Sequence, residues 1–398
     1  MHATHILNTH LQKTCQDIHK VRWKALMSTV TALIQGKKLC VTGLGRSMPG
    51  GAYEKHQIKK ADRLIGNVYI NHERTRIYGA LAHWFMGHCR QPLIHVDWSD
   101  LSSGREFHWL RATIPVGGRA LPIYEESHRE NNYGNPQIEK RFLKTLKRIL
   151  PANCRPIIVT DAGFRTPWFR SVQSMDWDFV GRVGGYHMVS PQGESAWTRT
   201  ENLFATATGR ARYLGYIDLF RHKPLACHAY LLKKQKQGRV KKTQFGQRCV
   251  SVQSEKNAQR ERTPWLIVTS LSGGSTMTKR VMNIYKTRMQ IEEAFRDMKN
   301  SRWGFSLCEA KCTTTARYEN LMLVGTLATF AVWLMGKVAE LKQWQYRYQA
   351  NTTRTRNILS TFFLGCQVFR KSSSIFGKSD YTEAIKAMRQ QVMEQTYV

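Results

Sequence analysis

Acidic residues are scarce in this chain. It has 28 Asp and Glu residues against 61 Lys and Arg residues, and its formal net charge is +33 over 398 residues. A surplus of positive charge on this scale favours a polyanionic partner, and nucleic acid is the expected one. Ribosomal proteins share such a charge, but they are usually shorter and poorer in tryptophan. The length indicates two or three domains with a substantial core.

The chain also has few long apolar runs. Its first residues, MHATHILNTHLQK, contain no apolar segment of the signal-peptide type. The longest uncharged apolar run, LMLVGTLATFAVWLMG at 321–336, is shorter than the roughly 20 residues that a bilayer requires. We therefore expect this run to form a buried core helix, in a cytoplasmic protein without a membrane partner.

A disulfide framework is missing as well. The nine cysteines are odd in number and scattered, which fits a reducing cytoplasm. Cys308 and Cys312 are followed by no second Cys or His pair at zinc-finger spacing. A structural zinc site is not expected.

The chain does contain one helical stretch with an unusual polar face, NIYKTRMQIEEAFRDMKN at 283–300. At about 100° per residue, four polar side chains fall within a sector of about 60°. They are Tyr285, Arg288, Glu292 and Lys299. The opposite sector is apolar. A solvated face with ion pairs between residues four apart, such as Arg288 with Glu292, explains this pattern without any function. A functional interpretation needs partners elsewhere in the chain.

Two such partners have the same local form, an apolar run that ends in an aspartate. PLIHVDWSD at 92–100 and PIIVTDAG at 156–163 each predict a buried strand that carries Asp97 or Asp161 to the edge of a sheet. Together with Glu292 these aspartates form an oxygen-only set, which suits Mg²⁺ or Mn²⁺ rather than zinc. Two such ions can activate an attacking oxygen and stabilise a leaving oxygen in phosphodiester cleavage.

Neighbouring acids compete for these roles. Asp100 could replace Asp97, and Glu293 or Asp297 could replace Glu292. Asp97 adjoins the apolar strand, whereas Asp100 lies in the polar turn that follows. Glu293 is displaced by about 100° from the Tyr285 face and Asp297 by more. We therefore favour Asp97 and Glu292.

These residues resemble a known family, the DDE transposases of bacterial insertion sequences. The four polar residues of the helix match the Tyr-(2)-Arg-(3)-Glu-(6)-Lys signature of one subgroup, and the stretches around Asp97 and Asp161 look like the family's two aspartate regions. The likeness is closest to the hairpin-forming, cut-and-paste members. It implies that Asp97, Asp161 and Glu292 are catalytic and bind two Mg²⁺ ions, with Mn²⁺ as a substitute.

The resemblance also implies the partners. They are double-stranded DNA, as the terminal inverted repeats of the element and as the target, and a second copy of the chain in a paired-end complex. We expect Tyr285, Arg288 and Lys299 to bind phosphates near the cleaved end. Localisation would be cytoplasmic and nucleoid-associated in a bacterium.

The fold class that we predict is α/β, with an RNase H-like core whose mixed sheet is flanked by helices. Three strands, a helix, a strand, a helix and a strand follow from about residue 90, and in that fold the first and fourth strands lie side by side. We expect five regions. They are a helical DNA-binding domain at 1–85, the first part of the core at 86–184, a β-rich insertion at 185–262, the second part of the core with the Glu292 helix at 263–345, and a C-terminal helical region for DNA contact or dimerisation at 346–398.

Two further groups of DNA-binding residues are predicted. The basic helix at 53–66 suits a helix-turn-helix-like reader of DNA, although a plain helical bundle with a charged face fits the pattern equally well. Its cations are Lys55, Lys59, Lys60 and Arg63. Trp265 has two interpretations, packing in the core or stacking on a base flipped from the DNA end, as the resemblance implies.

Two other functions fit parts of the pattern. A DNA-binding protein without catalysis, such as a repressor or a domesticated transposase, would share the charge and the N-terminal helices. An RNase H-like nuclease would cut DNA without joining it. Three intact carboxylates argue against the first, because unneeded acids near one another cost stability. The N-terminal region and the long insertion favour a transposase over the second.

Overall fold

A computed structural model describes residues 3–102, 104–185, 187–234, 263–353, 355–371 and 376–396. The chain forms two compact units, one made of Met1–Pro156 with Thr287–Tyr397 and the other made of Ile157–Lys286. Helices and strands of mixed orientation occur in the described part, and the predicted α/β class is confirmed. The predicted domain boundary near residue 85 lies inside the first unit.

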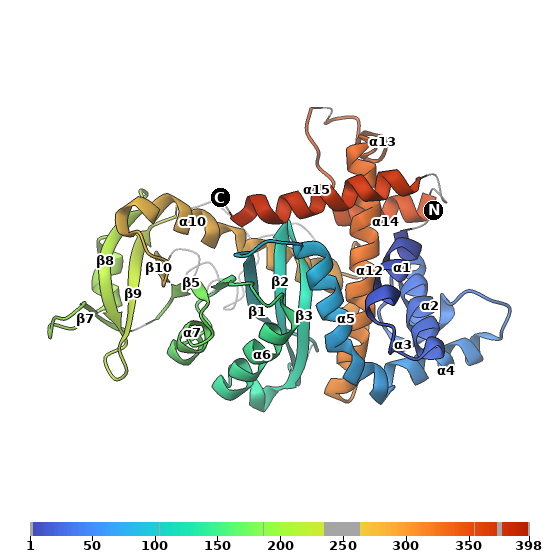
Figure 1. Cartoon of the computed structure of the whole chain (residues 1–398), viewed down its shortest axis with the longest axis horizontal. Coiled ribbons are helices and arrows are strands. Elements are labelled where there is room, and N and C mark those ends of the chain that lie inside the picture. The colour runs from blue at the N-terminus through green and yellow to red at the C-terminus, as the bar shows by residue number, and fades with distance from the viewer. Residues whose placement is uncertain are drawn as a thin grey trace, which may run out of the picture. The chain divides into compact units, whose positions relative to one another are not determined.

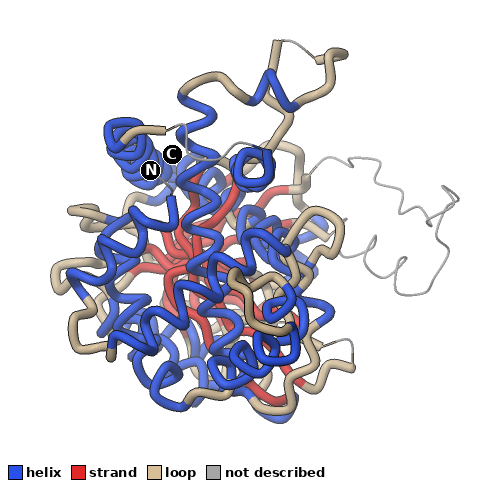
Figure 2. Tube along the Cα trace, turned by 90° about the vertical axis from the view of Figure 1, so that its right-hand side faces the viewer, coloured by secondary structure: helices blue, strands red, loops and turns tan. Residues whose placement is uncertain are grey.

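The first unit begins with helices, as predicted. They are α1 (Ala3–Thr14), α2 (Lys20–Gly36), α3 (Val41–Arg46), α4 (Glu54–Ile65) and α5 (Val68–Met86). Asn67 caps α5 by accepting a hydrogen bond from the backbone N–H of Ile70 (3.0 Å). A Cβ on Gly45 would lie 2.4 Å from Cα of Ile58, so glycine lets α3 and α4 approach closely. Seen from the side of these helices, the helical layer stands in front of the strands (Figure 2).

Three antiparallel strands follow. They are β1 (Leu93–Asp100), β2 (Phe107–Val116) and β3 (Arg119–Arg129), with β2 in the middle. Gly117 and Gly118 take positive φ values of 53° and 82° between β2 and β3, which closes a β-hairpin. Helix α6 (Pro136–Ile149) comes next and is capped by Asn135.

The register of these strands aligns three charged residues. Asp97 of β1 lies opposite Arg111 of β2, which lies opposite Glu125 of β3. Residues opposite each other in antiparallel strands point to the same face. Arg111 is fully buried and its Nε donates a hydrogen bond to Glu125 Oε1 (2.6 Å).

Helix α12 (Thr315–Leu341) is the central helix of the first unit (Figure 1). It contacts α1, α2, α4, α5, β3, and the C-terminal helices α14 (Thr361–Lys371) and α15 (Lys378–Thr396). Among the described residues it is the one helix long and apolar enough to cross a membrane, and its most apolar window is entirely buried inside the protein. The predicted core helix at 321–336 is therefore confirmed.

Helices α12 and α14 touch through their backbones. A Cβ on Gly336 would lie 2.0 Å from the carbonyl oxygen of Thr361, and a Cβ on Gly365 would lie 2.0 Å from that of Val332. No larger residue fits at either position without displacing a helix. The remaining helices of this unit are α11 (Met289–Lys299) and α13 (Gln345–Tyr348).

The second unit consists mostly of strands in the order β4-β5-β10-β9-β8-β6-β7. Their bounds are β4 (Ile157–Thr160), β5 (Asp178–Val183), β6 (Met188–Pro191), β7 (Thr198–Arg199), β8 (Arg212–Leu219), β9 (Leu225–Leu232) and β10 (Trp265–Thr269). Strands β4 and β5 are parallel and are joined by α7 (Thr166–Gln173). The predicted succession of three strands, helix, strand, helix and strand is thus present from β1 to β5.

Strands also prevail in the described part of the predicted insertion, although the short helix α8 (Thr200–Ala205) lies there as well. The sequence of this insertion contains a stretch rich in Lys and Arg at 233–248, KKQKQGRVKKTQFGQR, of which residues 235–248 lie outside the described residues. The last element of this unit is α10 (Thr278–Thr287), after a 3₁₀ turn at Gly274–Met277. Two further 3₁₀ turns, Glu130–Asn132 and Leu307–Glu309, belong to the first unit.

Candidate active site

The helix predicted at 283–300 is interrupted at Arg288. Helix α10 ends at Thr287 and α11 begins at Met289, so the prediction of one continuous helix was wrong. The backbone N–H of Ile291 bonds to the carbonyl of Arg288 (3.1 Å), three residues back instead of four, which tightens the first turn of α11. The apolar face of α11 is buried as predicted, through Ile291, Ala294, Phe295 and Met298.

Arg288 joins two of the three predicted catalytic carboxylates. Its Nη1 donates to Asp97 Oδ2 (3.4 Å) and its Nη2 donates to Glu292 Oε1 (2.5 Å). The side chains of Arg288 and Asp97 are 13% and 12% exposed, whereas that of Glu292 is 41% exposed. The fork of one guanidinium thus holds a strand carboxylate and a helix carboxylate together. We call Arg288, Asp97 and Glu292 the Arg288 cluster.

The donor chemistry of this cluster fits a hard divalent cation. Asp97 and Glu292 supply carboxylate oxygens only, and both are already directed at one positive group. In the part of the chain that the structure describes, no three His, Cys, Asp or Glu side chains are grouped as a metal site. Asp161 belongs to the other compact unit.

Asp161 directly follows β4, as the strand prediction required. Its Oδ1 accepts a hydrogen bond from the backbone N–H of Gly163 (2.8 Å), which closes a tight turn after the strand. The side chain remains partly exposed. It is therefore held directly after the end of β4 in a partly exposed position.

His95 connects β1 to the start of α11, a role that sequence reasoning missed. The residue is fully buried, and its Nε2 lies 2.8 Å from Thr287 Oγ1. Burial and, to a smaller extent, the charge of Arg288 lower the pKa of His95 to about 3, so the ring is neutral at physiological pH. The signal available in the sequence was a histidine within the apolar run, two residues before Asp97. Its partner Thr287 lies 192 positions away.

Lys299 lies at the other end of α11 and is largely buried. Its Nζ donates to Ser99 Oγ (2.7 Å). Burial lowers the pKa of Lys299 to about 8, while Asp100 and Asp97 act in the opposite direction. This cation is therefore held beside the end of β1, close to the charge of Asp97.

The competing acids have other partners. Arg119, at the start of β3, bonds through Nε to Asp297 Oδ2 (3.0 Å), and its Nη1 lies 3.6 Å from Glu293 Oε2. Asp100 pairs with Arg105 (3.4 Å) and His108 (3.2 Å). Glu292, rather than Glu293 or Asp297, thus shares a cation with Asp97. We call Arg119, Glu293 and Asp297 the Arg119 cluster.

Tyr285 and Trp265 pack on each other in the second unit. Their ring centroids are 5.0 Å apart at 77°, an edge-to-face contact. Tyr285 is 3% exposed, whereas Trp265 is only half-buried and has Lys234 Nζ 5.3 Å from its ring centroid. Tyr285 is thus buried against Trp265, although the helical pattern placed it on a polar face.

The predicted cations of the N-terminal region lie on one helix and are exposed. Helix α4 buries Ala61, Leu64 and Ile65 and turns its charged side chains outward. They are Lys55, Lys59, Lys60 and Arg63.

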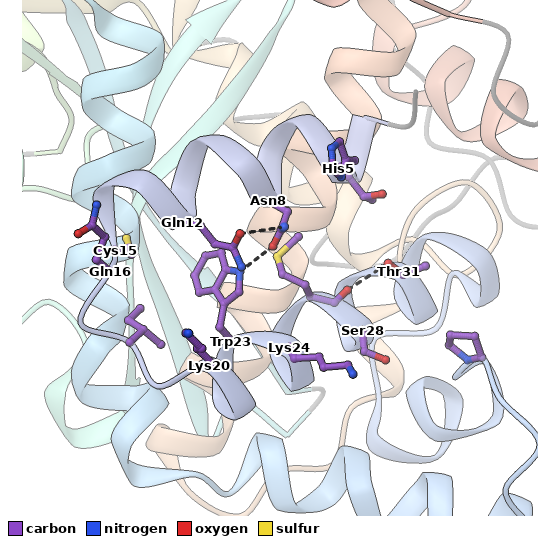
Figure 3. A pocket seen from close by; sticks show the side chains of 14 residues that line it. His5, Asn8, Gln12, Cys15, Gln16, Lys20, Trp23, Lys24, Ser28 and Thr31 are labelled. Atoms are coloured by element: carbon purple, nitrogen blue, oxygen red, sulfur yellow. Dashed lines mark hydrogen bonds between the residues drawn. The ribbon is translucent and has the colours of Figure 1, made fainter. Parts of the chain in front are cut away.

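A groove of about 870 Å³ lies between α1 and α2. Within it Trp23 Nε1 donates to Asn8 Oδ1 (2.6 Å), and Lys20 and Lys24 stand along the α2 side (Figure 3). The N-terminal helices therefore present both a cationic face and a groove.

The chain matches one family of known proteins. The family described as "Transposase DDE domain" matches residues 89–328, which is more than half of the chain. This range includes Asp97, Asp161 and Glu292. No curated protein matches the chain.

Proposed function

The chain belongs to the transposase DDE domain family, and from this premise we propose that it is a cut-and-paste DNA transposase of an insertion sequence that acts through DNA hairpins. The observation that carries this proposal is the Arg288 cluster. It unites an aspartate of β1 and a glutamate of α11 from positions far apart in the chain. Arg288 and Glu292 also belong to the set Tyr285, Arg288, Glu292 and Lys299, whose spacing matches the resembling subgroup.

Asp97, Asp161 and Glu292 are the proposed metal ligands. When bound, two Mg²⁺ or Mn²⁺ ions would supply charge for activating the attacking oxygen and for stabilising the leaving oxygen. No side chain needs to act as a nucleophile, because positioning and electrostatic stabilisation dominate phosphoryl transfer.

The proposed reaction has four steps. Water hydrolyses the phosphodiester at the transposon end and leaves a 3′-hydroxyl. That hydroxyl attacks the opposite strand, forms a hairpin and releases the flanking DNA. A second water opens the hairpin, and the regenerated 3′-hydroxyl joins the target strand. In each step, a new P–O bond forms to the attacking oxygen, which gives up its proton. The P–O bond to the leaving oxygen breaks, and the leaving oxygen takes up a proton.

The chain's own cations would hold the DNA during these steps. Arg288 offers a planar fork for a phosphate and Lys299 a point charge. Trp265 is half-buried rather than fully packed in the core, which supports the proposal that it stacks on a displaced base. The exposed cations of α4 are the proposed contact to the terminal inverted repeat.

The assembly that we propose is a pair of chains that holds two DNA ends. The regions at 1–85 and 346–398 would provide the end-binding and pairing functions. The setting is the bacterial cytoplasm, next to the nucleoid.

The test is cleavage of labelled linear DNA that carries the element's terminal repeats, with Mg²⁺ or Mn²⁺. Wild-type protein should nick, form hairpins and join strands. Asp97→Ala, Asp161→Ala and Glu292→Ala should bind the repeats but perform no step. A wild-type protein that binds the repeats and never cuts them with either metal would favour the DNA-binding function without catalysis, and one that cuts without joining would favour a nuclease.

A further inference from the structure

The Arg288 cluster has one positive and two negative groups, and the positive group stands between the two proposed metal ligands. Each Nη atom of Arg288 bonds to a different carboxylate, so the guanidinium takes up one oxygen of each. These oxygens are the atoms that a shared divalent cation would use. The arginine and a metal ion thus compete for the same two carboxylates.

Burial and exposure are distributed unequally over this cluster. Arg288 and Asp97 are nearly buried, whereas Glu292 is 41% exposed. A hydrated ion therefore has access to the cluster from the side of Glu292. Without Arg288, Asp97 and Glu292 would carry two negative charges that the guanidinium no longer balances.

We propose that Arg288 is a positioning residue that holds Asp97 and Glu292 together before metal binds, and that a divalent ion competes with Arg288 for these carboxylates. This inference rests on the proposed metal site. Binding of the ion releases the guanidinium fork, which is then free for a phosphate of the DNA end. One side chain thus couples loading of the metal to capture of the DNA.

The experiment measures the affinity of the full-length protein for Mn²⁺ without DNA, by calorimetry or electron paramagnetic resonance. An opposite charge this close typically changes the proton affinity of a carboxylate by about one to three pKa units. Removal of the competing cation should therefore tighten Mn²⁺ binding in Arg288→Gln by roughly tenfold or more. Arg288→Lys, which keeps the charge but cannot form two parallel bonds, should lie between wild type and Arg288→Gln.

Arg296→Gln is the matched control. Arg296 lies on the same helix and pairs with Glu293 (2.8 Å), outside the Arg288 cluster. Its loss removes the same charge without freeing Asp97 or Glu292, so the Mn²⁺ affinity should stay within about twofold of wild type, as expected for an exposed ion pair. Thermal unfolding of all variants establishes that each one is folded.

The outcomes separate this inference from the metal site itself. If wild type binds Mn²⁺, Glu292→Gln does not, and Arg288→Gln or Arg288→Lys binds no more tightly than wild type, competition is refuted while the metal site stands. If wild-type binding does not depend on Glu292, the metal site and the inference fall together. Tighter binding in Arg288→Gln but not in Arg296→Gln supports the exchange.

Discussion

Two clusters beside one helix have the same composition and different geometry. The Arg288 cluster and the Arg119 cluster each contain one arginine between two carboxylates. In the first, the carboxylates come from β1 and α11. In the second, both come from α11, four residues apart, and only the arginine comes from the sheet. The first therefore brings two acids from different elements together, whereas the second fastens a helix to a strand.

The two clusters also differ in their exposure. Asp297 of the Arg119 cluster is 16% exposed, and burial raises the pKa of Asp297 to about 6 despite the opposing effect of Arg119. Glu292 has more than twice that exposure. Equal charge composition thus gives a stabilising contact in one place and, in the other, a nearly buried aspartate joined to a solvent-accessible glutamate.

The largest expected effect comes from neutralising Glu292 of the Arg288 cluster, compared with neutralising either acid of the Arg119 cluster. Glu292→Gln should lower DNA nicking at least about a hundredfold, since it removes a group that stabilises transition-state charge. Glu293→Gln and Asp297→Asn should stay within a few fold of wild type. Nicking of a labelled terminal-repeat duplex under equal binding measures all three. Comparable losses in the three variants would abolish the distinction between the clusters.

The second effect concerns stability as a function of pH. Because the pKa of Asp297 is raised from 3.8 to about 6, the folded protein binds this proton more tightly than the unfolded chain. The resulting stability is present below 3.8 and is lost as the pH rises to about 6. Between these two pH values the wild type should lose on the order of 2 to 3 kcal/mol in its free energy of unfolding through this group, and Asp297→Asn should not show this loss.

Urea unfolding of both proteins at several pH values measures the difference in the free energy of unfolding. A difference that is constant with pH would contradict the raised pKa of Asp297. Glu293→Gln serves as the control for the same cluster.

The third effect tests the cation at the end of the helix. Burial lowers the pKa of Lys299 to about 8, so its ammonium loses its proton as the pH rises through that value. DNA affinity should fall by about tenfold with the loss of one charged hydrogen bond. Lys299→Arg should retain its affinity above pH 8, because arginine stays protonated. Identical pH profiles for the two proteins would exclude Lys299 as the titrating group.

The smallest effect concerns the arginine that ties α11 to β3. Arg119→Gln should cost about 1 kcal/mol of stability, since the ion pair is partly exposed, and should leave the Mn²⁺ affinity unchanged. Denaturant midpoints and Mn²⁺ titration together test this. A change in Mn²⁺ affinity as large as that of Arg288→Gln would show that the two clusters are not independent.

Local pattern was sufficient to predict one side of the active site. The angular position of Glu292 relative to Glu293 and Asp297 follows from helical periodicity, and the apolar faces of α11 and α12 follow from composition. The position of Asp161 directly after β4 follows from an apolar run that stops at an acid. These are properties that neighbours in sequence determine. The same apolar pattern wrongly placed Asp97 at the end of its strand and Asp100 in the following turn, because β1 continues to Asp100.

Long-range partners were not predictable in the same way. The bond between Arg288 and Asp97 spans 191 positions, and that between His95 and Thr287 spans 192. Nothing in either segment specifies the other. The break at Arg288 was also not predicted. The helical projection at 100° per residue assumes regular geometry, and the sequence has no Pro or Gly near Arg288 that would indicate a break.

The position of α12 in the chain has a consequence for synthesis. Helices α1, α2, α4 and α5 end by Met86, but the helix that completes their packing spans Thr315–Leu341. At about 5 to 20 residues per second, the ribosome needs on the order of tens of seconds to add the intervening chain. During that interval the nascent N-terminal helices lack their main apolar partner. Chains that terminate before α12 are therefore expected to be substrates for proteases, and only nearly complete translation products become stable protein.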